Sequence, residues 1–486
     1  MKILNKFLLL TTILMTVFLL TSCNTKGEYE DAMTFSDDLA GVKLRGLYGF
    51  IDMEGNLKIK PSYEQVQSFD NGTALVKQNG LWGLIDKTNT VIIPFKYTEA
   101  SMAPNNLISV KENDKYGCIN LNGDVVVDFI SSDPIEISYG SDKHTIALIT
   151  DNNKKGFIDL ATGFNVQPIY DEIFYHGNGN NLVTLVVNNK VNNPNTIYAN
   201  LDTQTIINPQ YENPLYFQDG LASVKINGKY GYINTNNEIV IEPIYDDSPC
   251  FTEGLAPASL SGKYGYINTS GELVIPPIYD YTTLFYNGLA IVYLDNKSGL
   301  INTKGEFLCE PNFSQIDWYG DSDIIPAAYI DDNGNFKYVC INKYGEILFE
   351  TNYTKIMPLM SNSQDILQVK KNNKVGYINK KGIEILSPIY DNARQIGELF
   401  IVSTNNKYGL VGKYQKDLLK CEYTSITHFS ENIFSISKDN KYGIYNATTN
   451  TFTELLYDEM RFPHDNVIPV RIGDKWHYID LDGNKL

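Results

Sequence analysis

The sequence predicts an all-β fold in which tandem meander repeats, each of three or four short strands, stack as propeller-like blades. Three observations lead to this prediction. A short strand pattern returns thirteen times with a commonest step of 34 residues, turns rich in Gly, Asn and Ser separate the strands, and the middle strand of each unit is apolar on both faces. The alternative is an open β-solenoid of hairpins, because a unit in a repeat array needs only to contact its neighbours.

The strand pattern is clearest in GKYGYIN, at Gly228–Asn234 and again at Gly262–Asn268, and in KVGYINKKG at Lys374–Gly382. A glycine stands at the centre of most copies and marks the repeat. A fixed period of this size indicates a repeat architecture. The marker positions of the thirteen copies are Gly49, Gly83, Gly117, Gly156, Ile197, Gly231, Gly265, Gly299, Val339, Gly376, Gly409, Gly443 and His477.

The unit that starts at Phe251 shows how one repeat is built. Its segments LAPASL, YGYIN and ELVIPP predict three strands, and SGK and TSG predict the turns between them. Pro277–Asp280 ends the third strand, because proline cannot donate a hydrogen bond to a central ladder. The TTLF segment that follows is a candidate for a fourth short edge strand.

The middle strand predicts how the units pack. The two residues after the marker, such as Tyr232 and Ile233, are both apolar although neighbouring strand residues point to opposite faces. We therefore expect each sheet to be sandwiched between others. The marker glycine shares a face with the isoleucine two residues on, so we expect it to permit a close approach of the neighbouring sheet. In the fifth copy this pair has become Ile197 and Ala199, which keeps the bulk on one face.

The array is predicted to span residues 35–486, because Phe35 stands in the same register to the first marker as Phe217 does to Gly231. The last unit, KWHYIDLDGNKL, stops where its third strand is due to begin. A start and a stop within a meander leave room for the terminal strands to pair with each other. They fit a solenoid with frayed ends equally well.

Residues 1–22 are predicted to be a cleaved signal peptide, with a basic start and an apolar stretch at Phe7–Leu20. The tetrapeptide Leu-Thr-Ser-Cys at 20–23 resembles the lipobox of bacterial lipoproteins. This resemblance implies that Cys23 is the lipid attachment site and first mature residue, and that residues 23–34 form a short tether. The alternative is an ordinary signal peptide with an incidental cysteine. We therefore expect an exported chain, anchored by lipid to a bacterial membrane of the cell envelope.

The chain is acidic, with a net charge of −17 that becomes −19 when Lys2 and Lys6 leave with the signal peptide. Such a surface repels phosphate backbones, so no nucleic acid is expected as a partner. It also argues against a polybasic membrane contact, which leaves the lipid as the membrane link. The five cysteines after Cys23 are scattered singly and indicate neither a zinc site nor a disulfide framework. Cys118 and Cys340 share one repeat position and are predicted to pack in the core.

The copy GLWGLID at Gly80–Asp86, with Tyr-Gly in the same place elsewhere, resembles the bacterial WG-repeat family. The similarity covers essentially the mature chain, although tryptophan stands at the diagnostic position only in Trp82 and Trp476. Members of the family consist of tandem β-rich repeats and are often secreted or lipid-anchored. The resemblance implies binding or scaffolding without a shared catalytic set.

Motifs for chemistry are missing from the sequence, so we expect no enzyme, no cofactor and no metal site. The five histidines form no paired ligand spacing, and there is no nucleophile elbow, P-loop or Rossmann pattern. The Asp- and Asn-rich turns at Asp331–Asn335 and Asp480–Asn484 lack the distal glutamate of an EF-hand loop. The recurring Asp or Asn after the middle strand is predicted to cap a turn.

The period lengthens to 39, 41 and 40 residues before Gly156, Ile197 and Val339. Inserted segments in repeat proteins often lie on the binding face, although tolerated loop growth explains them equally well. Trp318 and Tyr319 in an irregular stretch are candidates for sugar or peptide contacts, with ordinary packing as the alternative. The inserted residues include HGNGNN at 176–181, NNKVNNPN at 188–195 and DDNGN at 331–335.

Three functions fit these observations. The first is a lipid-anchored scaffold outside the cytoplasm that binds a protein or peptide, or a cell-wall glycan. The second is an envelope enzyme with catalytic residues on inserted loops. The third is a purely structural assembly subunit, which would expose a large apolar patch on a terminal unit.

Overall fold

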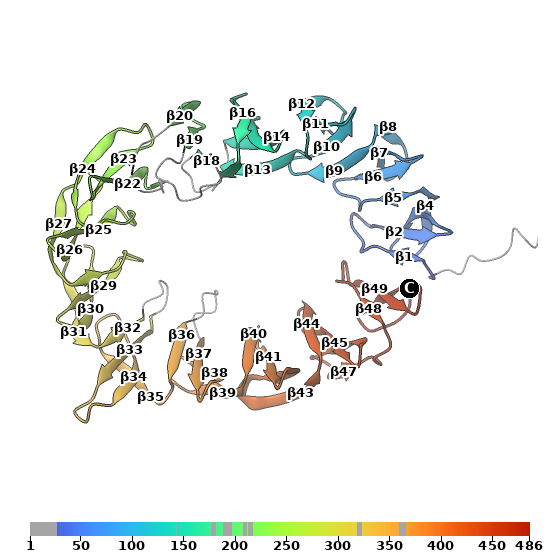
Figure 1. The fold of residues 1–486 in the computed structure, drawn as a ribbon. Helices are drawn as coiled ribbons and strands as arrows, with labels where there is room; N and C mark the ends of the chain where they lie inside the picture. The colour runs from blue at the N-terminus through green and yellow to red at the C-terminus, as the bar shows by residue number, and fades with distance from the viewer. Residues whose placement is uncertain are drawn as a thin grey trace, which may run out of the picture. The chain divides into compact units, whose positions relative to one another are not determined.

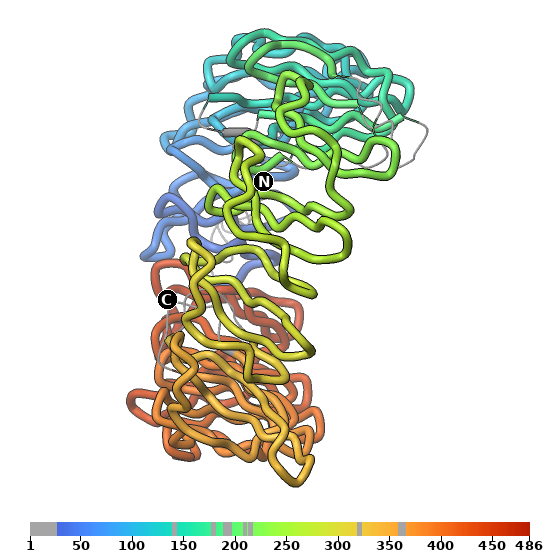
Figure 2. The backbone as a smooth tube through the Cα atoms, turned by 90° about the vertical axis from the view of Figure 1, so that its left-hand side faces the viewer, coloured from blue at the N-terminus to red at the C-terminus, as the bar shows by residue number. Residues whose placement is uncertain are grey.

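The computed structural model describes residues 27–141, 143–175, 181–187, 197–207, 211, 217–317, 323–358 and 366–486. Within these residues the fold is all-β, with thirteen small antiparallel sheets and one short 3-10 helix (Figure 1). The chain divides into two compact units. The first comprises residues 1–101, 121–123 and 422–486, and the second comprises residues 102–120 and 124–421. Figure 2 follows the succession of the sheets along the chain.

The strands follow one another sheet by sheet along the chain. The first six sheets are β1 (Asp31–Ala32), β2 (Leu39–Leu44), β3 (Leu47–Asp52), β4 (Leu57–Tyr63); β5 (Gln65–Val66), β6 (Thr73–Gln78), β7 (Leu81–Asp86), β8 (Val91–Tyr97); β9 (Glu99–Ala103), β10 (Leu107–Glu112), β11 (Lys115–Asn120), β12 (Val125–Ser131); β13 (Glu136–Ser141), β14 (His144–Asp151), β15 (Lys154–Asp159), β16 (Asn165–Tyr170); β17 (Glu172–Tyr175), β18 (Leu182–Val186), β19 (Ile197–Asn200), β20 (Thr205–Ile207); and β21 (Phe217–Gln218), β22 (Leu221–Ile226), β23 (Lys229–Asn234), β24 (Ile239–Tyr245). The remaining seven are β25 (Leu255–Leu260), β26 (Lys263–Asn268), β27 (Leu273–Tyr279); β28 (Tyr281–Thr282), β29 (Leu289–Leu294), β30 (Lys297–Asn302), β31 (Phe307–Phe313); β32 (Gln315–Ile316), β33 (Ile325–Ile330), β34 (Phe336–Ile341), β35 (Ile347–Thr351); β36 (Lys355–Pro358), β37 (Ile366–Lys371), β38 (Lys374–Asn379), β39 (Glu384–Tyr390); β40 (Asn392–Ile396), β41 (Leu399–Thr404), β42 (Lys407–Gly412), β43 (Lys416–Tyr423), with the 3-10 helix η1 (Lys413–Gln415) before β43; β44 (Ser425–Ser430), β45 (Ile433–Lys438), β46 (Lys441–Asn446), β47 (Thr451–Phe452); and β48 (Glu459–Met460), β49 (Val467–Ile472), β50 (Lys475–Asp480).

Each sheet is a meander, as the sequence predicts, but the short strand occupies a different place. The segment after Pro277–Asp280 does form a strand, β28, yet it pairs with β29 of the next sheet and not with β27. The amide of Asp280 already donates to Tyr293 O at 2.8 Å. The chain therefore passes to the next sheet at the end of each third strand, and the short strand begins a sheet.

The middle strands are buried on both faces, which confirms the prediction of sheets stacked on sheets. Tyr266 and Ile267 of β26 have no exposed surface. The Tyr266 ring lies 4.6 Å from that of Phe285, in the next repeat, and its hydroxyl donates to Thr283 O at 2.6 Å. An apolar contact and a hydroxyl therefore join one sheet to the next. The prediction that Cys118 and Cys340 are core residues is also confirmed.

The marker glycines serve a purpose that the sequence prediction missed. A Cβ on Gly265 would lie 2.3 Å from Ile275 O, in the third strand of the same sheet. The pairing jumps there from Tyr264 with Tyr279 to Tyr266 with Ile275, which is a β-bulge. The predicted sheet-to-sheet approach at this glycine is therefore wrong: the close approach lies within the sheet.

The copies without glycine support this interpretation. Val339 pairs directly with Glu350, and the neighbouring pairs on the Tyr338 side follow without a register shift. In the fifth copy, Tyr198 and Ala199 likewise pair in regular register with β20. A side chain at the marker position is therefore found where the third strand does not bulge over it.

The two ends of the described chain meet within the first unit. Tyr29 and Trp476 exchange backbone hydrogen bonds of 3.0 and 2.9 Å, which complete the three-stranded sheet β48–β50. The same pairing in an ordinary sheet joins Trp82 with Tyr97. Residues before Phe35 therefore take part in the array, including part of the segment predicted as a tether. Figure 1 shows β1, at the blue end, beside β48 and β49 at the red end.

Side chains strengthen this junction of the ends. The Arg461 guanidinium lies 4.0 Å from the centre of the Trp476 ring and donates to Asp31 Oδ1 at 3.1 Å. His477 Nδ1 donates to Gly27 O at 2.7 Å. The Tyr478 hydroxyl donates to Met33 O at 2.6 Å, as Tyr hydroxyls do between consecutive sheets. The expectation that the terminal strands can pair is confirmed.

Candidate functional site

The period breaks where the sheets β13–β16 and β17–β20 adjoin in the second unit, and a buried histidine lies there. His144 begins β14, and its side chain is 5% exposed. Asp159 ends β15 of the same sheet and is fully buried, whereas Asp202 lies after β19 of the next sheet and is 54% exposed. Two sheets thus place a carboxylate on either side of one imidazole.

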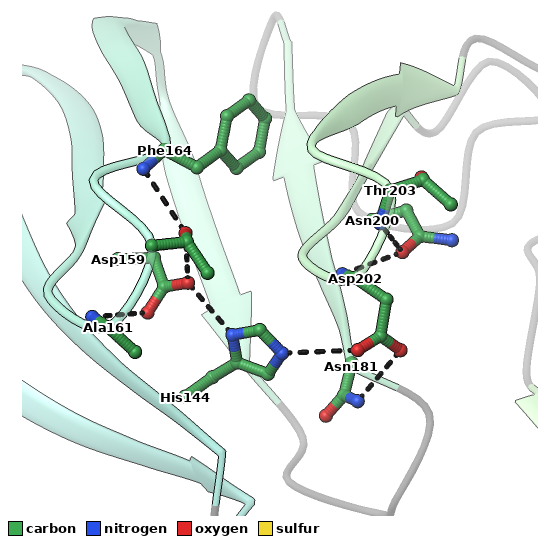
Figure 3. Close-up of polar contacts among 9 residues, drawn as sticks. His144, Asp159, Ala161, Phe164, Asn181, Asn200, Asp202 and Thr203 are labelled. Atoms are coloured by element: carbon green, nitrogen blue, oxygen red, sulfur yellow. Dashed lines mark hydrogen bonds and ion pairs between the residues drawn. The ribbon is translucent and has the colours of Figure 1, made fainter.

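Both ring nitrogens of His144 contact a carboxylate (Figure 3). Nδ1 lies 2.8 Å from Asp159 Oδ2, and Nε2 lies 3.2 Å from Asp202 Oδ1. Only the imidazolium can donate from both nitrogens at once. The geometry therefore favours the charged ring, which then forms an ion pair within its own sheet and another with the next.

Local turns hold the two carboxylates in place. Asp159 occupies the turn position that follows each middle strand, and it accepts hydrogen bonds from Thr162 Oγ1 at 2.6 Å and from the Ala161 amide at 3.2 Å. Asp202 accepts a bond from Asn181 Nδ2 at 2.9 Å. Asn200 is the turn residue of the next sheet, and its Oδ1 accepts the Asp202 amide at 3.0 Å. The repeat's ordinary turn capping thus supplies the site.

Electrostatics agree with a charged ring. Burial disfavours the imidazolium, but hydrogen bonds to Asp159 and Asp202 outweigh it and raise the pKa of His144 above its ordinary value. Burial likewise opposes ionisation of Asp159, whereas Thr162 and His144 stabilise the carboxylate and lower its pKa. The bond from Asn181 is the main cause of the lowered pKa of Asp202. The three groups stabilise one another in their charged forms.

The arrangement is better suited to joining sheets than to catalysis. A carboxylate that orients one ring nitrogen is also found beside general bases, whose other nitrogen faces a hydroxyl, a thiol or a water. Here the other nitrogen faces Asp202. Among the residues that the structure describes, no group of three or more His, Cys, Asp or Glu side chains could hold a metal ion. His144 therefore acts as an ionic clamp between two sheets.

The sequence did not single out His144, although a signal was present. In regular repeats the position two residues before the first full strand holds an Asp, Glu or Asn in a left-handed turn, such as Asn71 with φ 49° or Asn287 with φ 46°. His144 stands there instead, and β14 starts two residues early to include it. A histidine in place of a turn residue, beside a lengthened step, is the pattern that could have identified the site.

Several residues of the sequence predictions lie outside the described part of the chain. These include the signal peptide, Cys23, Trp318 and Tyr319, as well as residues 176–180 and 188–195 of the inserted segments. The two Asp- and Asn-rich turns that lack the EF-hand glutamate lie within the described residues, and each is a capped turn: Asp331 Oδ1 accepts the Asn335 amide at 2.8 Å, and Asp480 Oδ1 accepts the Asn484 amide at 2.8 Å. Within the described residues no helix is long and apolar enough to cross a membrane.

Comparison with known families agrees with the repeat geometry. The family model described as WG containing repeat matches residues 25–48, 48–82, 82–116, 198–230, 230–264, 264–297, 376–408, 418–442 and 442–476. The chain belongs to the WG-repeat family. These matches run from one middle strand to the next, so the family's repeat unit has the length of one sheet but covers the second half of one meander and the first half of the following one. The resemblance proposed from Trp82 and its Tyr-Gly counterparts is thus confirmed.

Other comparisons add no functional information about this WG-repeat protein. No curated protein matches it. Solved structures with similar regions include PorZ of the type-IX secretion system of Porphyromonas gingivalis (7% identity, 94% of this chain and 86% of that one, TM-score 0.20), a eukaryotic initiation factor (11%, 74% and 96%, 0.27) and BamB from Moraxella catarrhalis (10%, 71% and 96%, 0.24). Scores this low carry no argument about function.

Proposed function

We propose that this WG-repeat protein is a lipid-anchored scaffold outside the cytoplasm that binds a protein or peptide partner at the cell envelope. The observation that carries the proposal is the position of Cys23. It ends an apolar export signal in a lipobox-like tetrapeptide, a few residues before a repeat array whose first strand begins at Asp31. A lipid on Cys23 would hold that array close to a membrane surface.

The way the sheets are built supports a binding role. Both faces of the middle strands are buried by packing. The amino-acid sequence of the short first strand and of the turns can therefore vary between repeats. The first residue of the short strand is Asp31, Gln65, Tyr281 or Lys355 in different sheets. A constant interior with variable exposed positions is how repeat proteins present extended binding surfaces.

The lipid anchor is tested by Cys23→Ser. We expect this variant to lose labelling by a radioactive or alkynyl fatty acid and to leave the membrane fraction. Cys250→Ser is the matched control, because Cys250 is a half-buried free thiol that should not be acylated. A Cys23→Ser chain that stays labelled and membrane-bound would disprove the lipid assignment.

The binding role is tested with the full chain purified in detergent. We expect it to capture a specific protein from envelope extracts, and not to pellet with insoluble cell-wall glycan. Capture by glycan alone would move the proposal to the carbohydrate alternative. The envelope-enzyme alternative predicts that the full chain turns over an envelope polymer, whereas the scaffold proposal predicts no such turnover.

A further inference from the structure

Several sheets carry a built-in cation over an aromatic ring. The fifth residue of the first full strand is a lysine, and the residue directly opposite on the middle strand is Tyr or Trp. The ammonium lies over the ring in a cation–π contact. In the described chain these pairs are Lys43 over Tyr48 at 5.5 Å, Lys77 over Trp82 at 5.9 Å, Lys111 over Tyr116 at 5.1 Å and Lys225 over Tyr230 at 5.4 Å.

Two consecutive sheets of the second unit depart from this pattern. In β25–β27 the lysine position is Ser259, which stands opposite Tyr264. In β28–β31 it is Tyr293, which pairs on its other side with Tyr281 of the short strand. Tyr281 is also exceptional, because the equivalent position in the other described short strands is polar or charged, as in Gln65 and Gln315.

The three tyrosines form one aromatic surface. The Tyr264 and Tyr281 rings lie 5.6 Å apart at 70°, and the Tyr281 and Tyr293 rings lie 5.9 Å apart at 55°. Tyr281, in the middle, is 54% exposed. Tyr264 and Tyr293 are half-buried and support it from two different sheets. We call these three residues the tyrosine cluster.

The surroundings of the tyrosine cluster are acidic. Asp247 Oδ2 accepts the Tyr264 hydroxyl at 2.8 Å. Burial first, and then the Asp317 carboxylate, raise the pKa of Tyr293, so Asp317 is close enough to act on it. The nearby Lys263 is already bound to Asp280, with Nζ 2.5 Å from Oδ1. An accessible ring in an aromatic cluster that also contacts a carboxylate attracts a cation both by its π face and by charge.

We propose that the tyrosine cluster binds a lysine or arginine side chain of a protein partner, an external counterpart of the lysine that lies over an aromatic ring in sheets such as β21–β24. The proposal rests on the proposed scaffold function and names the chemistry of its partner. The partner's cation would sit over the exposed Tyr281 ring, with the Asp247 carboxylate at the neighbouring Tyr264. A sugar ligand would stack on the aromatic ring but would not need the negative charge of the nearby carboxylate.

The test uses the full chain immobilised in detergent and two blocked peptides, Gly-Arg-Gly-Arg-Gly and the same peptide with Gln in place of each Arg. Binding is followed by surface plasmon resonance. Tyr281→Gln and Tyr293→Lys each install the residue that repeat β5–β8 has at Gln65 and Lys77. We expect each to weaken binding of the Arg peptide at least about fivefold. Tyr281→Gln changes no charge, so general attraction to the acidic chain stays constant.

Tyr408→Ala is the matched control. Tyr408 is 38% exposed and stands opposite Ser403, without a second tyrosine on the short strand. We expect the Tyr408→Ala variant to bind the Arg peptide with the same affinity as the wild type. Equal binding of both peptides, an unchanged affinity in both cluster variants, or an equal loss in Tyr408→Ala would each overturn the proposal. Thermal melts confirm folding, and should one cluster variant unfold, the other decides.

The outcomes separate this inference from the scaffold function. If Tyr281→Gln still captures the envelope partner as strongly as the wild type, the scaffold function stands and the tyrosine cluster is not its contact. If the wild-type chain captures no partner yet binds the Arg peptide through Tyr281, the cluster is confirmed as a cation site and the scaffold proposal fails.

Discussion

The regular sheet β25–β27 and the sheet β13–β16, where the period lengthens, are joined to their next neighbours by different chemistry. Tyr266 contributes an aromatic contact and a hydroxyl bond, and burial raises its pKa far above the physiological range. His144 contributes an imidazolium between two carboxylates. The Tyr266 contacts therefore do not change with pH near neutrality, whereas the junction at the break in period depends on the charge of one ring.

The interior of the regular sheet and that of β17–β20 differ as well. Gly265 leaves room for a bulged third strand, whereas Ile197 begins a middle strand whose third strand pairs regularly. The bulge and the glycine belong together, and the lengthened repeat has lost both. At Ile197 the break in period thus marks a change in strand geometry and not merely a longer loop, whereas the lengthened repeat at Gly156 keeps both the glycine and the bulge.

The largest effect is expected for Gly265→Ala. The new Cβ would lie 2.3 Å from Ile275 O and 2.7 Å from Pro277 N, both backbone atoms that cannot move without disturbing the bulge. We expect a loss of about 3 kcal/mol in the free energy of unfolding. The measurement is urea denaturation of the purified chain, followed by circular dichroism.

Gly412→Ala is the control for this substitution. Gly412 has φ −81°, and a Cβ there would lie 3.4 Å from the nearest atom, Lys416 Cβ. We expect a change of less than about 0.5 kcal/mol. Equal destabilisation by both substitutions would show that the marker glycines are not required by the bulge.

A smaller, pH-dependent effect is expected for His144→Gln. The pKa of His144 is raised in the folded chain, so its stabilising contribution is complete below its ordinary pKa of 6.5 and is lost as the pH rises through the raised value. The pKa values of Asp159 and Asp202 are lowered, so their contribution is complete above 3.8 and is lost only at more acidic pH. We expect His144→Gln to cost about 2 kcal/mol near pH 5.5 and clearly less at pH 9.

The comparison with the regular junction supplies the control. Tyr266→Phe removes a buried hydroxyl bond, so it should cost about 1 kcal/mol at both pH values. Denaturation midpoints of the two variants and the wild type, measured from pH 5 to 9, distinguish the two behaviours. If His144→Gln loses the same free energy of unfolding at every pH, the imidazole forms no ion pair with Asp159 or Asp202.

The repeat signature was enough to predict the fold, for reasons visible in single residues. Tyr232 and Ile233 are apolar neighbours on one strand, which requires packing on both faces, and the structure buries both. The turn residues also behaved as predicted: Asn268 Oδ1 accepts the amides of Ser270 and Glu272 at 3.1 and 2.9 Å. Local chemistry that repeats along the chain can be inferred from one sequence.

Two features were not predicted from the sequence, because both depend on contacts between residues that are not neighbours in the chain. The purpose of Gly265 required the path of the third strand, whose bulge has no signature of its own in Leu273–Tyr279. The His144 site brings together Asp159 and Asp202, which are 15 and 58 positions away and look like ordinary turn residues. The bulge exists only in the pairing of two strands, and the clamp does not repeat with the period. Periodicity alone therefore predicts neither.

The smallest effect is expected for the recurring ion pair between the middle strand and the Asp of Pro-Ile-Tyr-Asp. Lys374 Nζ lies 2.5 Å from Asp391 Oδ1, and both side chains are more than a third exposed. Asp391 Oδ2 also accepts the Asn405 amide at 2.8 Å and so holds the next hairpin turn. Lys374→Met should therefore change the free energy of unfolding little, and Asp391→Ala should lower it more, because it also removes the turn bond. Urea denaturation of both variants at low and high salt checks these expectations. In high salt only the effect of Lys374→Met on the free energy of unfolding should vanish. If the lysine substitution costs more than the aspartate one, the pair and not the turn bond explains why this Asp recurs in regular repeats.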